Sequence, residues 1–148
     1  MMIRRAIVDD ASRIAEILIF TKRMNYRRIF RDDKVSFGEM QVNPLAKEYI
    51  DNPNKLEGIW VYDDEFVKGI IHINGGQIEE LYVDTFFENQ GIGAGLIEYA
   101  IQQNNCNWLW VLEKNTQAIH FYEKHGFIIT EERQLEEGTT EYLVKMVR

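Results

Sequence analysis

Three glycines within five residues mark the stretch whose spacing most clearly suggests chemistry. They stand in the run Gln90-Gly91-Ile92-Gly93-Ala94-Gly95. The apolar residues that begin there have the spacing of one helix face: Ile92, Leu96, Ile97, Ala100 and Ile101. The first turn of a helix offers unpaired N–H groups and a partial positive charge to an anion such as phosphate. Because one glycine in a helix interior costs about 1 kcal/mol, three together indicate a loop that binds a ligand.

Two familiar phosphate-binding loops do not fit this spacing. A dinucleotide fingerprint needs a third glycine where the sequence has Leu96, and a P-loop needs lysine and then serine or threonine after Gly95. The run instead resembles the Q/R-x-x-G-x-G/A loop of the GNAT superfamily of N-acetyltransferases. In that family the loop binds the pyrophosphate of acetyl coenzyme A (acetyl-CoA), and a preceding L-x-V strand segment lies along the pantetheine arm. The resemblance implies an acetyl-CoA site that contains these residues: Leu81, Tyr82, Val83, Gln90, Gly91, Ile92, Gly93, Ala94, Gly95 and Asn115.

A second motif runs from Asn115 to Phe127. It resembles the N-x-x-A-x-x-F-Y-x-x-x-G-F segment that follows the fifth strand in GNAT enzymes. Tyr122 matches the family's usual general acid, and a phenol with a reference pKa of about 10 can protonate a leaving thiolate. The alternative is a tyrosine that packs in the core beside Phe121. Asn115 can cap the helix, and it matches a position that contacts the cofactor in the family.

Acetyl transfer to an amine also needs a group that takes the proton of the attacking ammonium. Side chains alternate across a strand, so Gln77 and Glu79 share a face with Leu81 unless a bulge interrupts the strand. The resemblance places a base two or four residues before the L-x-V segment, which selects Glu79, since Gln77 cannot take a proton. Glu80 competes if the register shifts, and both glutamates also fit a solvated surface. Some relatives carry a glutamate on the fifth strand, where this sequence has Trp110.

Strands and helices alternate around these motifs along the whole chain. Periodicity and turn signals predict strands over residues 3–8, 59–62, 66–73, 79–84, 107–112, 127–130 and 142–147. Helices are predicted after Asp9 or Asp10, after Asn43, at the glycine loop and in the second motif. The resemblance implies an α/β (α+β) fold with a mixed, mostly antiparallel twisted sheet of about seven strands, flanked by about four helices. It also implies that the fourth and fifth strands splay apart, and we expect one GNAT-like domain over residues 1–148.

The first predicted helix turns an apolar face to the core and leaves Arg13 and Glu16 to solvent. At its end, basic residues follow one another without an acid among them: Lys22, Arg23, Arg27, Arg28 and Arg31. A solvated helix face explains such a run, and so does recognition of an anionic group on a substrate. Together with the helix after Asn43, this part would form a flap.

Composition argues against several other classes of protein. The formal net charge of −7 disfavours general nucleic-acid binding. Cys106 is the only cysteine, and His120 and His125 lack the spacing of a zinc motif, so we expect neither a disulfide nor a bound metal. No apolar run is long enough for a signal peptide or a membrane span, so we expect a cytoplasmic protein with no membrane partner.

The function hypothesis is an N-acetyltransferase that moves an acetyl group from acetyl-CoA to a primary amine of a small molecule by direct attack. The Glu79-Glu80 pair favours a cationic amine, whereas the basic run from Lys22 to Arg31 favours an amine that also bears a carboxylate or phosphate. Because screening makes nearby charges outweigh net charge, we expect the second kind of acceptor. Two alternatives are a non-catalytic acyl-CoA-binding regulatory module and a toxin-like acetyltransferase that acts on aminoacyl-tRNA; the net charge disfavours the latter.

Overall fold

A mixed sheet organises the computed structural model, which describes residues 2–29 and 41–148, with the backbone alone for residues 26–29. Within these residues the sheet has seven strands in the order β1-β2-β3-β4-β5-β7-β6. They are β1 (Ile3–Arg5), β2 (Ile59–Asp64), β3 (Phe66–Asn74), β4 (Gln77–Val83), β5 (Trp108–Leu112), β6 (Ile128–Leu135) and β7 (Tyr142–Val147). Only β4 and β5 pair in parallel; the other neighbouring strands are antiparallel. The predicted mixed, mostly antiparallel sheet is confirmed.

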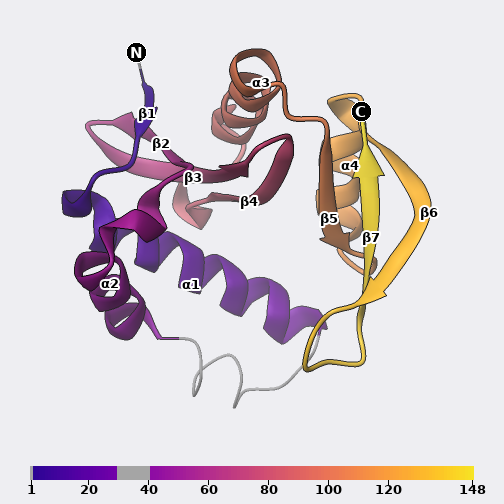
Figure 1. Ribbon diagram of the computed structural model, residues 1–148, viewed down its shortest axis with the longest axis horizontal. Coiled ribbons are helices and arrows are strands. Elements are labelled where there is room, and N and C mark those ends of the chain that lie inside the picture. The colour runs from indigo at the N-terminus through magenta and orange to yellow at the C-terminus, as the bar shows by residue number, and fades with distance from the viewer. Residues whose placement is uncertain (1, 30–40) are drawn as a thin grey trace.

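Helices cover both faces of this sheet (Figure 1). They are α1 (Ala11–Ile29), α2 (Val42–Asp51), α3 (Ile92–Asn104) and α4 (Thr116–Lys124), with short 3₁₀ helices at Val8–Asp10, Pro53–Leu56 and Thr85–Phe87. In Figure 1, α1 and α2 lie on one side of β2–β4 and α3 lies on the other. None of the helices in the described ranges has the length and apolar character needed to cross a bilayer.

Two apolar clusters hold these layers together. On the α3 side, Leu96 and Ile97 pack with strand residues such as Ile71 and Leu109. On the α1 side, a second cluster joins the helix to β2 and β3 through Ile14, Ile17, Leu18, Val61 and Ile70. The helix faces predicted from apolar spacing are therefore the buried faces, and burying a leucine or isoleucine side chain is worth about 1.5–3 kcal/mol.

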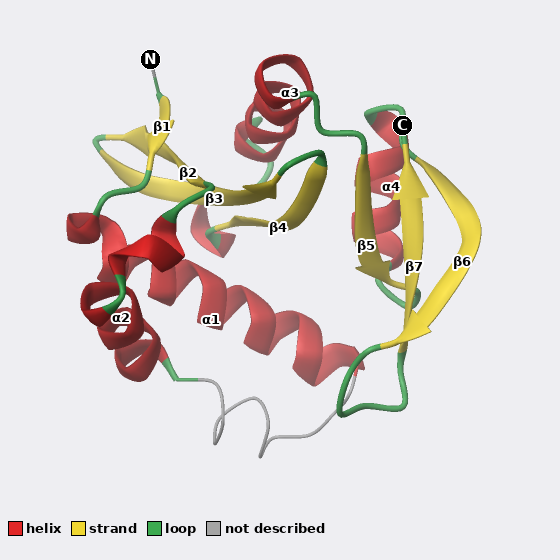
Figure 2. Ribbon diagram, viewed as in Figure 1, coloured by secondary structure: helices red, strands yellow, loops and turns green. Residues whose placement is uncertain are grey.

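The sheet opens between β4 and β5 (Figure 2). These strands pair only at Gln77 with Trp108 and at Ile78 with Leu109. Farther along, β4 stays paired with β3 up to Val83, while β5 pairs with β7 up to Leu112. The expected splay of the fourth and fifth strands is confirmed, and it leaves one edge of β4 open.

Several local predictions need correction. Arg13 does not extend into solvent: its guanidinium donates to the carbonyl of Val67 at 2.8 Å and to Asp84 at 2.6 Å, which ties α1 to β3 and to the end of β4. Asp10 ends the 3₁₀ turn that leads into α1, where its carboxylate accepts from the Ile7 N–H, as in a capping box, and also from Arg4. Arg13 departs from its predicted role because its charged partner Asp84 lies 71 residues away in the sequence, whereas the partners of Asp10 are local.

The boundaries of two strands differ most from the sequence prediction. The first strand ends at Arg5, because the 3₁₀ turn begins at Val8, and β6 continues to Leu135. A bulge between Ile129 and Arg133 lets β6 keep pairing with β7 through charged residues that carry no alternating apolar signal. The sequence prediction therefore ended this edge strand too early, because its second half is mostly charged.

Candidate active site

A cavity of about 620 Å³ lies at the splay between β4 and β5. Three elements line it with residues that the sequence singled out: Glu79 to Val83 on β4, Gly91 to Ala94 at the start of α3, and Asn115 and Tyr122 at α4. Helix α1 contributes Thr21, Lys22 and Asn25. Of the predicted acetyl-CoA residues, Gln90 and Gly95 are the two that do not line the cavity.

The glycine loop presents free backbone donors to this cavity. Asn89 and Gly91 both have left-handed backbone angles, with φ of 63° and 82°, which turn the chain sharply into α3. The N–H of Gly95 makes the first helical bond, to the Gly91 carbonyl at 3.0 Å. The three N–H groups between them, of Ile92, Gly93 and Ala94, donate to no residue in the described ranges, and no acid lies in the first turn. This arrangement suits an anion.

The three glycines of the loop differ in backbone angle and in what a side chain at each position would contact. Gly91 adopts a positive φ that side chains rarely tolerate. Gly93 is helical, and a Cβ there would lie 3.4 Å from the Phe121 ring and 3.6 Å from Val83 Cγ2, so the glycine permits a close approach of α4 and β4. A Cβ on Gly95 would meet only Tyr62, at 3.8 Å. Gly95 does not line the cavity, and its role at the cofactor stays a prediction.

A fourth glycine, which the sequence analysis missed, positions α3. Gly69 lies in β3, and a Cβ there would come within 2.9 Å of Ile92 Cγ2 and 3.1 Å of Leu96 Cδ1. The helix that carries the loop can pack so closely only because this strand residue has no side chain. A glycine inside a strand pattern was the available signal.

The open edge of β4 offers further backbone donors. The N–H of Asp84 donates to the Lys68 carbonyl at 2.9 Å, so the N–H groups of even-numbered residues point to β3. By alternation, those of Leu81 and Val83 point the other way, toward the gap before β5. Because β5 pairs with β4 only as far as Ile78, these groups face the cavity instead of a neighbouring strand.

Tyr122 lies at the wall of the cavity between α4 and the core. Its ring packs edge-to-face with Phe121 and Phe127, at centroid distances of 5.3 and 6.0 Å. Burial raises the pKa of its phenol, so the group stays protonated at physiological pH. The hydroxyl donates to no residue in the described part of the chain. Asn115 caps α4 as predicted, since its Oδ1 accepts from the Ala118 N–H at 3.2 Å.

The two glutamates of β4 occupy different surroundings, because Glu79 is the extra residue of a β-bulge between Ile78 and Glu80, which pair with Ile73 and His72. The premise that Gln77, Glu79 and Leu81 share one face is therefore wrong. Glu79 is exposed and accepts from Asn74 Nδ2 at 3.0 Å. Glu80 lies deeper, on the α1 side of the sheet, and both glutamates line the cavity.

Charged partners surround Glu80. Lys22 Nζ lies 3.3 Å from its Oε2, and His72 Nδ1 lies 3.7 Å from its Oε1 and 3.3 Å from Glu79 Oε2. Burial opposes ionisation of Glu80, but His72 and Lys22 outweigh it, so the pKa of Glu80 lies below its usual range. Contact with Glu80 raises the pKa of His72 against the effect of burial, with Glu79 adding to the rise. Sequence reasoning missed His72, because a lone histidine within a strand has no recognisable spacing.

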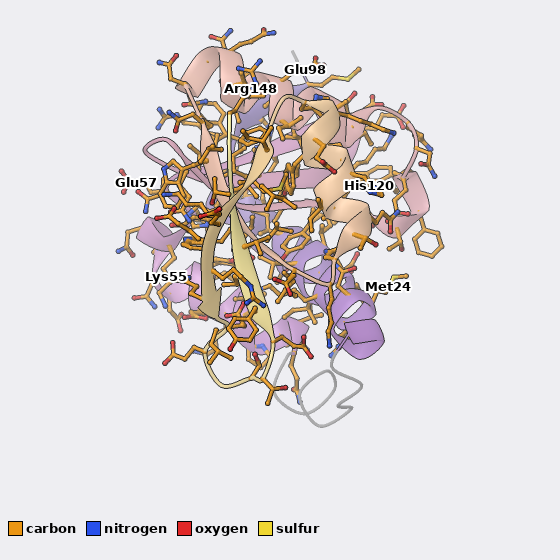
Figure 3. The ribbon with its side chains drawn as sticks, turned by 90° about the vertical axis from the view of Figure 1, so that its right-hand side faces the viewer. Met24, Lys55, Glu57, Glu98, His120 and Arg148 are labelled. Carbon is orange, nitrogen blue, oxygen red and sulfur yellow. The ribbon has the colours of Figure 1, made fainter. Side chains whose placement is uncertain are left out.

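Other predicted residues lie away from this cluster. His120 points outward from α4, between α3, marked by Glu98, and the end of α1, marked by Met24 (Figure 3). Of the basic run, Lys22 pairs with Glu80 and Arg23 lies over the Phe20 ring at 5.5 Å. The side chains of Arg27 and Arg28, and all of Arg31, lie outside the described residues. In the described ranges, no three His, Cys, Asp or Glu side chains are arranged to hold a metal ion.

Comparison with known proteins agrees with this geometry. The model of the "Acetyltransferase (GNAT) domain" family matches residues 55–129, from the turn before β2 into β6. The peptidyl-lysine N-acetyltransferase YjaB of Salmonella typhimurium is 32% identical over 90 residues, which are 61% of each chain. The chain thus spans about three fifths of the length of this curated relative.

Solved structures agree over nearly the whole chain. An N-acetyltransferase from Staphylococcus aureus superposes with a TM-score of 0.75 at 17% identity and full coverage of both chains. The PaiA N-acetyltransferase of Thermoplasma acidophilum, solved with coenzyme A, has a TM-score of 0.68 at 17% identity, over 99% of this chain and 98% of its own. At such low identity these likenesses establish the fold.

Proposed function

Because the chain belongs to the GNAT family of acetyltransferases, we propose that it transfers the acetyl group of acetyl-CoA to a primary amine. One observation carries the proposal: a single cavity joins the free N–H groups of the α3 start, the Tyr122 phenol and the carboxylates of Glu79 and Glu80. These are an anion site, an acid and candidate bases, and they come from elements distant in sequence.

In this proposal the start of α3 holds the pyrophosphate of acetyl-CoA. The N–H groups of Ile92, Gly93 and Ala94 and the helix dipole supply the attraction. The pantetheine arm lies along Leu81 to Val83, where the open edge of β4 offers donors and acceptors like those of a neighbouring strand. Asn115 lines the same cavity, and Gln90 would act from the rim of the loop. The PaiA N-acetyltransferase, which was solved in complex with coenzyme A, has the same fold, and this supports the placement.

The reaction needs a neutral amine, a stabilised oxyanion and a protonated leaving group. Glu80 lies on the acceptor side, but its lowered pKa and its ion pair make it a weak base; Glu79, which is more exposed, can pass a proton to solvent. The Val83 N–H faces the gap and can donate to the developing oxyanion. Tyr122 then gives its proton to the departing thiolate.

The cavity as a whole is acidic in the described part of the chain. Four carboxylates line the cavity, from Glu79, Glu80, Glu88 and Glu136, against one ammonium, from Lys22. This charge supports a cationic primary amine, which can be a small molecule or a lysine side chain. The name of the Salmonella relative, a peptidyl-lysine N-acetyltransferase, supports the lysine class. An acceptor with an added carboxylate or phosphate would depend on Arg27, Arg28 and Arg31, outside the described side chains.

Thiol release from acetyl-CoA tests the proposal. The acceptors are a polyamine, a lysine-containing peptide, the same peptide with its lysines acetylated, and an amino acid. We expect release with the first two and none with the acetylated peptide. Binding of acetyl-CoA without release in the presence of any amine would instead support an acyl-CoA-binding regulatory module.

A further inference from the structure

One primary amine of the protein itself already lies in the cavity. Lys22 extends from α1, and it is the one lysine among those described that lines the same space as Tyr122 and Gly93. Its Nζ is 3.3 Å from Glu80 Oε2, and its side chain is 27% exposed. The ammonium is therefore held at the cavity wall, neither packed in the core nor free in solution.

This position is the one that a cationic acceptor would use. Glu80 Oε2 is inaccessible to solvent and accepts no hydrogen bond from any described residue, although Lys22 lies within ion-pair distance. An incoming ammonium needs a carboxylate oxygen with capacity to accept, and Glu80 Oε2 has it. Lys22 thus holds a primary ammonium beside the carboxylate that the proposed function places on the acceptor side.

Transfer would require the Lys22 ammonium to move along the cavity from Glu80 toward Val83. Glu80 is three residues before Val83, which is about 10 Å on one strand. A lysine ammonium sits on a flexible four-carbon stem, and a partly exposed ion pair holds it weakly. Asn25, one turn after Lys22, lines the cavity too, so α1 runs beside the cavity instead of pointing away from it.

We propose that Lys22 is a self-acetylation site, an inference that rests on the proposed function. The Lys22 ammonium first loses one proton to solvent or to a carboxylate. Its Nζ then attacks the acetyl carbonyl, a C–N bond forms, the C–S bond breaks, and coenzyme A leaves as a thiol after protonation by Tyr122. The second proton of the attacking nitrogen leaves through solvent and restores the Tyr122 phenol. The net change converts the ammonium and acetyl-CoA into an acetamide, coenzyme A thiol and one released proton.

Modification would change the acceptor end of the cavity. Acetylation removes the positive charge of Lys22, and Glu80 then keeps only His72 as a charged partner at ion-pair distance among the described residues. An external cationic amine would no longer compete with a resident ammonium for the same oxygen.

Peptide mass spectrometry on the purified protein tests this inference. The protein is incubated with acetyl-CoA and no acceptor, and acetylation of each lysine is followed with time. Lys47 and Lys114, with side chains 77% and 64% exposed, report uncatalysed acetylation. We expect Lys22 to react on the order of tenfold faster than either, at a rate per molecule independent of protein concentration, and Tyr122→Phe to slow Lys22 alone. Lys22→Arg, which keeps the charge, should show no new fast site.

Two results would overturn the inference. One is acetylation of Lys22 at the rate of Lys47 and Lys114; the other is a Lys22 rate that Tyr122→Phe leaves unchanged. Transfer to an external amine is measured on the same preparation. Transfer to that amine with Lys22 unmodified rejects self-acetylation and keeps the proposed function, whereas transfer to neither rejects both.

Discussion

The two ends of the cavity are built from different materials. The end assigned to acetyl-CoA is largely backbone: the N–H groups of consecutive residues at the start of α3, and the open edge of β4. The acceptor end is made of side chains from three elements, Lys22 of α1, His72 of β3 and Glu80 of β4, each charged group facing another. A backbone site should respond mainly to changes at its glycines, while a side-chain site should respond to single charges and to pH.

The largest effect should arise where the two ends meet, at Tyr122. Tyr122→Phe keeps the packing against Phe121 and Phe127 and removes only the hydroxyl. A positioned acid contributes a factor on the order of 10²–10⁴, so we expect kcat to fall within that range and acetyl-CoA affinity to stay nearly constant. Steady-state kinetics with calorimetry measures both. An unchanged kcat would mean that Tyr122 serves only in packing.

The next effect concerns how the backbone end is positioned. Gly69→Ala places a Cβ 2.9 Å from Ile92 and 3.3 Å from the Tyr82 carbonyl, so α3 must shift. We expect a loss of about 1–3 kcal/mol in the free energy of unfolding, measured by urea denaturation. The matched control is Gly95→Ala, where the new Cβ has room and alanine's helix propensity should stabilise by up to about 1 kcal/mol. Equal effects of both changes would contradict the close approach at Gly69.

A smaller change tests the anion site itself. Gly93→Val adds a branched side chain at the start of α3, next to the free N–H groups and beside Phe121 and Val83. We expect the Kd for acetyl-CoA to rise about tenfold, which corresponds to about 1.4 kcal/mol. Gly95→Ala, outside the cavity, should leave the Kd unchanged. If calorimetry shows wild-type affinity for a folded Gly93→Val protein, the pyrophosphate does not bind there.

The smallest effect tests the side-chain end through pH. The pKa of His72 is higher in the folded protein than in the unfolded chain, so its contribution to stability is present below the ordinary histidine pKa of about 6.5 and is lost as pH rises through the folded value. The unfolding free-energy gap between wild type and His72→Asn should therefore shrink from about pH 6 to pH 8. NMR titration should find the His72 pKa elevated in wild type and lowered in Glu80→Gln. If Glu80→Gln leaves the pKa of His72 unchanged, Glu80 is not the group that raises it.

The sequence by itself determined the backbone end of the site. The glycine spacing, the apolar face of α3 and the second motif are local patterns, and local patterns record helix starts, caps and buried faces directly. Gly91 needs its positive φ and Asn115 caps α4 because of their immediate neighbours along the chain. The family and the mixed sheet followed from the order of such patterns.

Only the tertiary structure decided the acceptor end. The bulge at Glu79 arises from pairing with β3, and one extra residue was enough to break the alternation on which the choice of base depended. Lys22, His72 and Glu80 meet across 58 residues of sequence, and no spacing rule links them. Arg13 was expected in solvent for the same reason: its partner Asp84 comes near only when α1 packs on the sheet. Charged side chains find their partners through the fold, whereas helix starts and caps depend on neighbours in the chain.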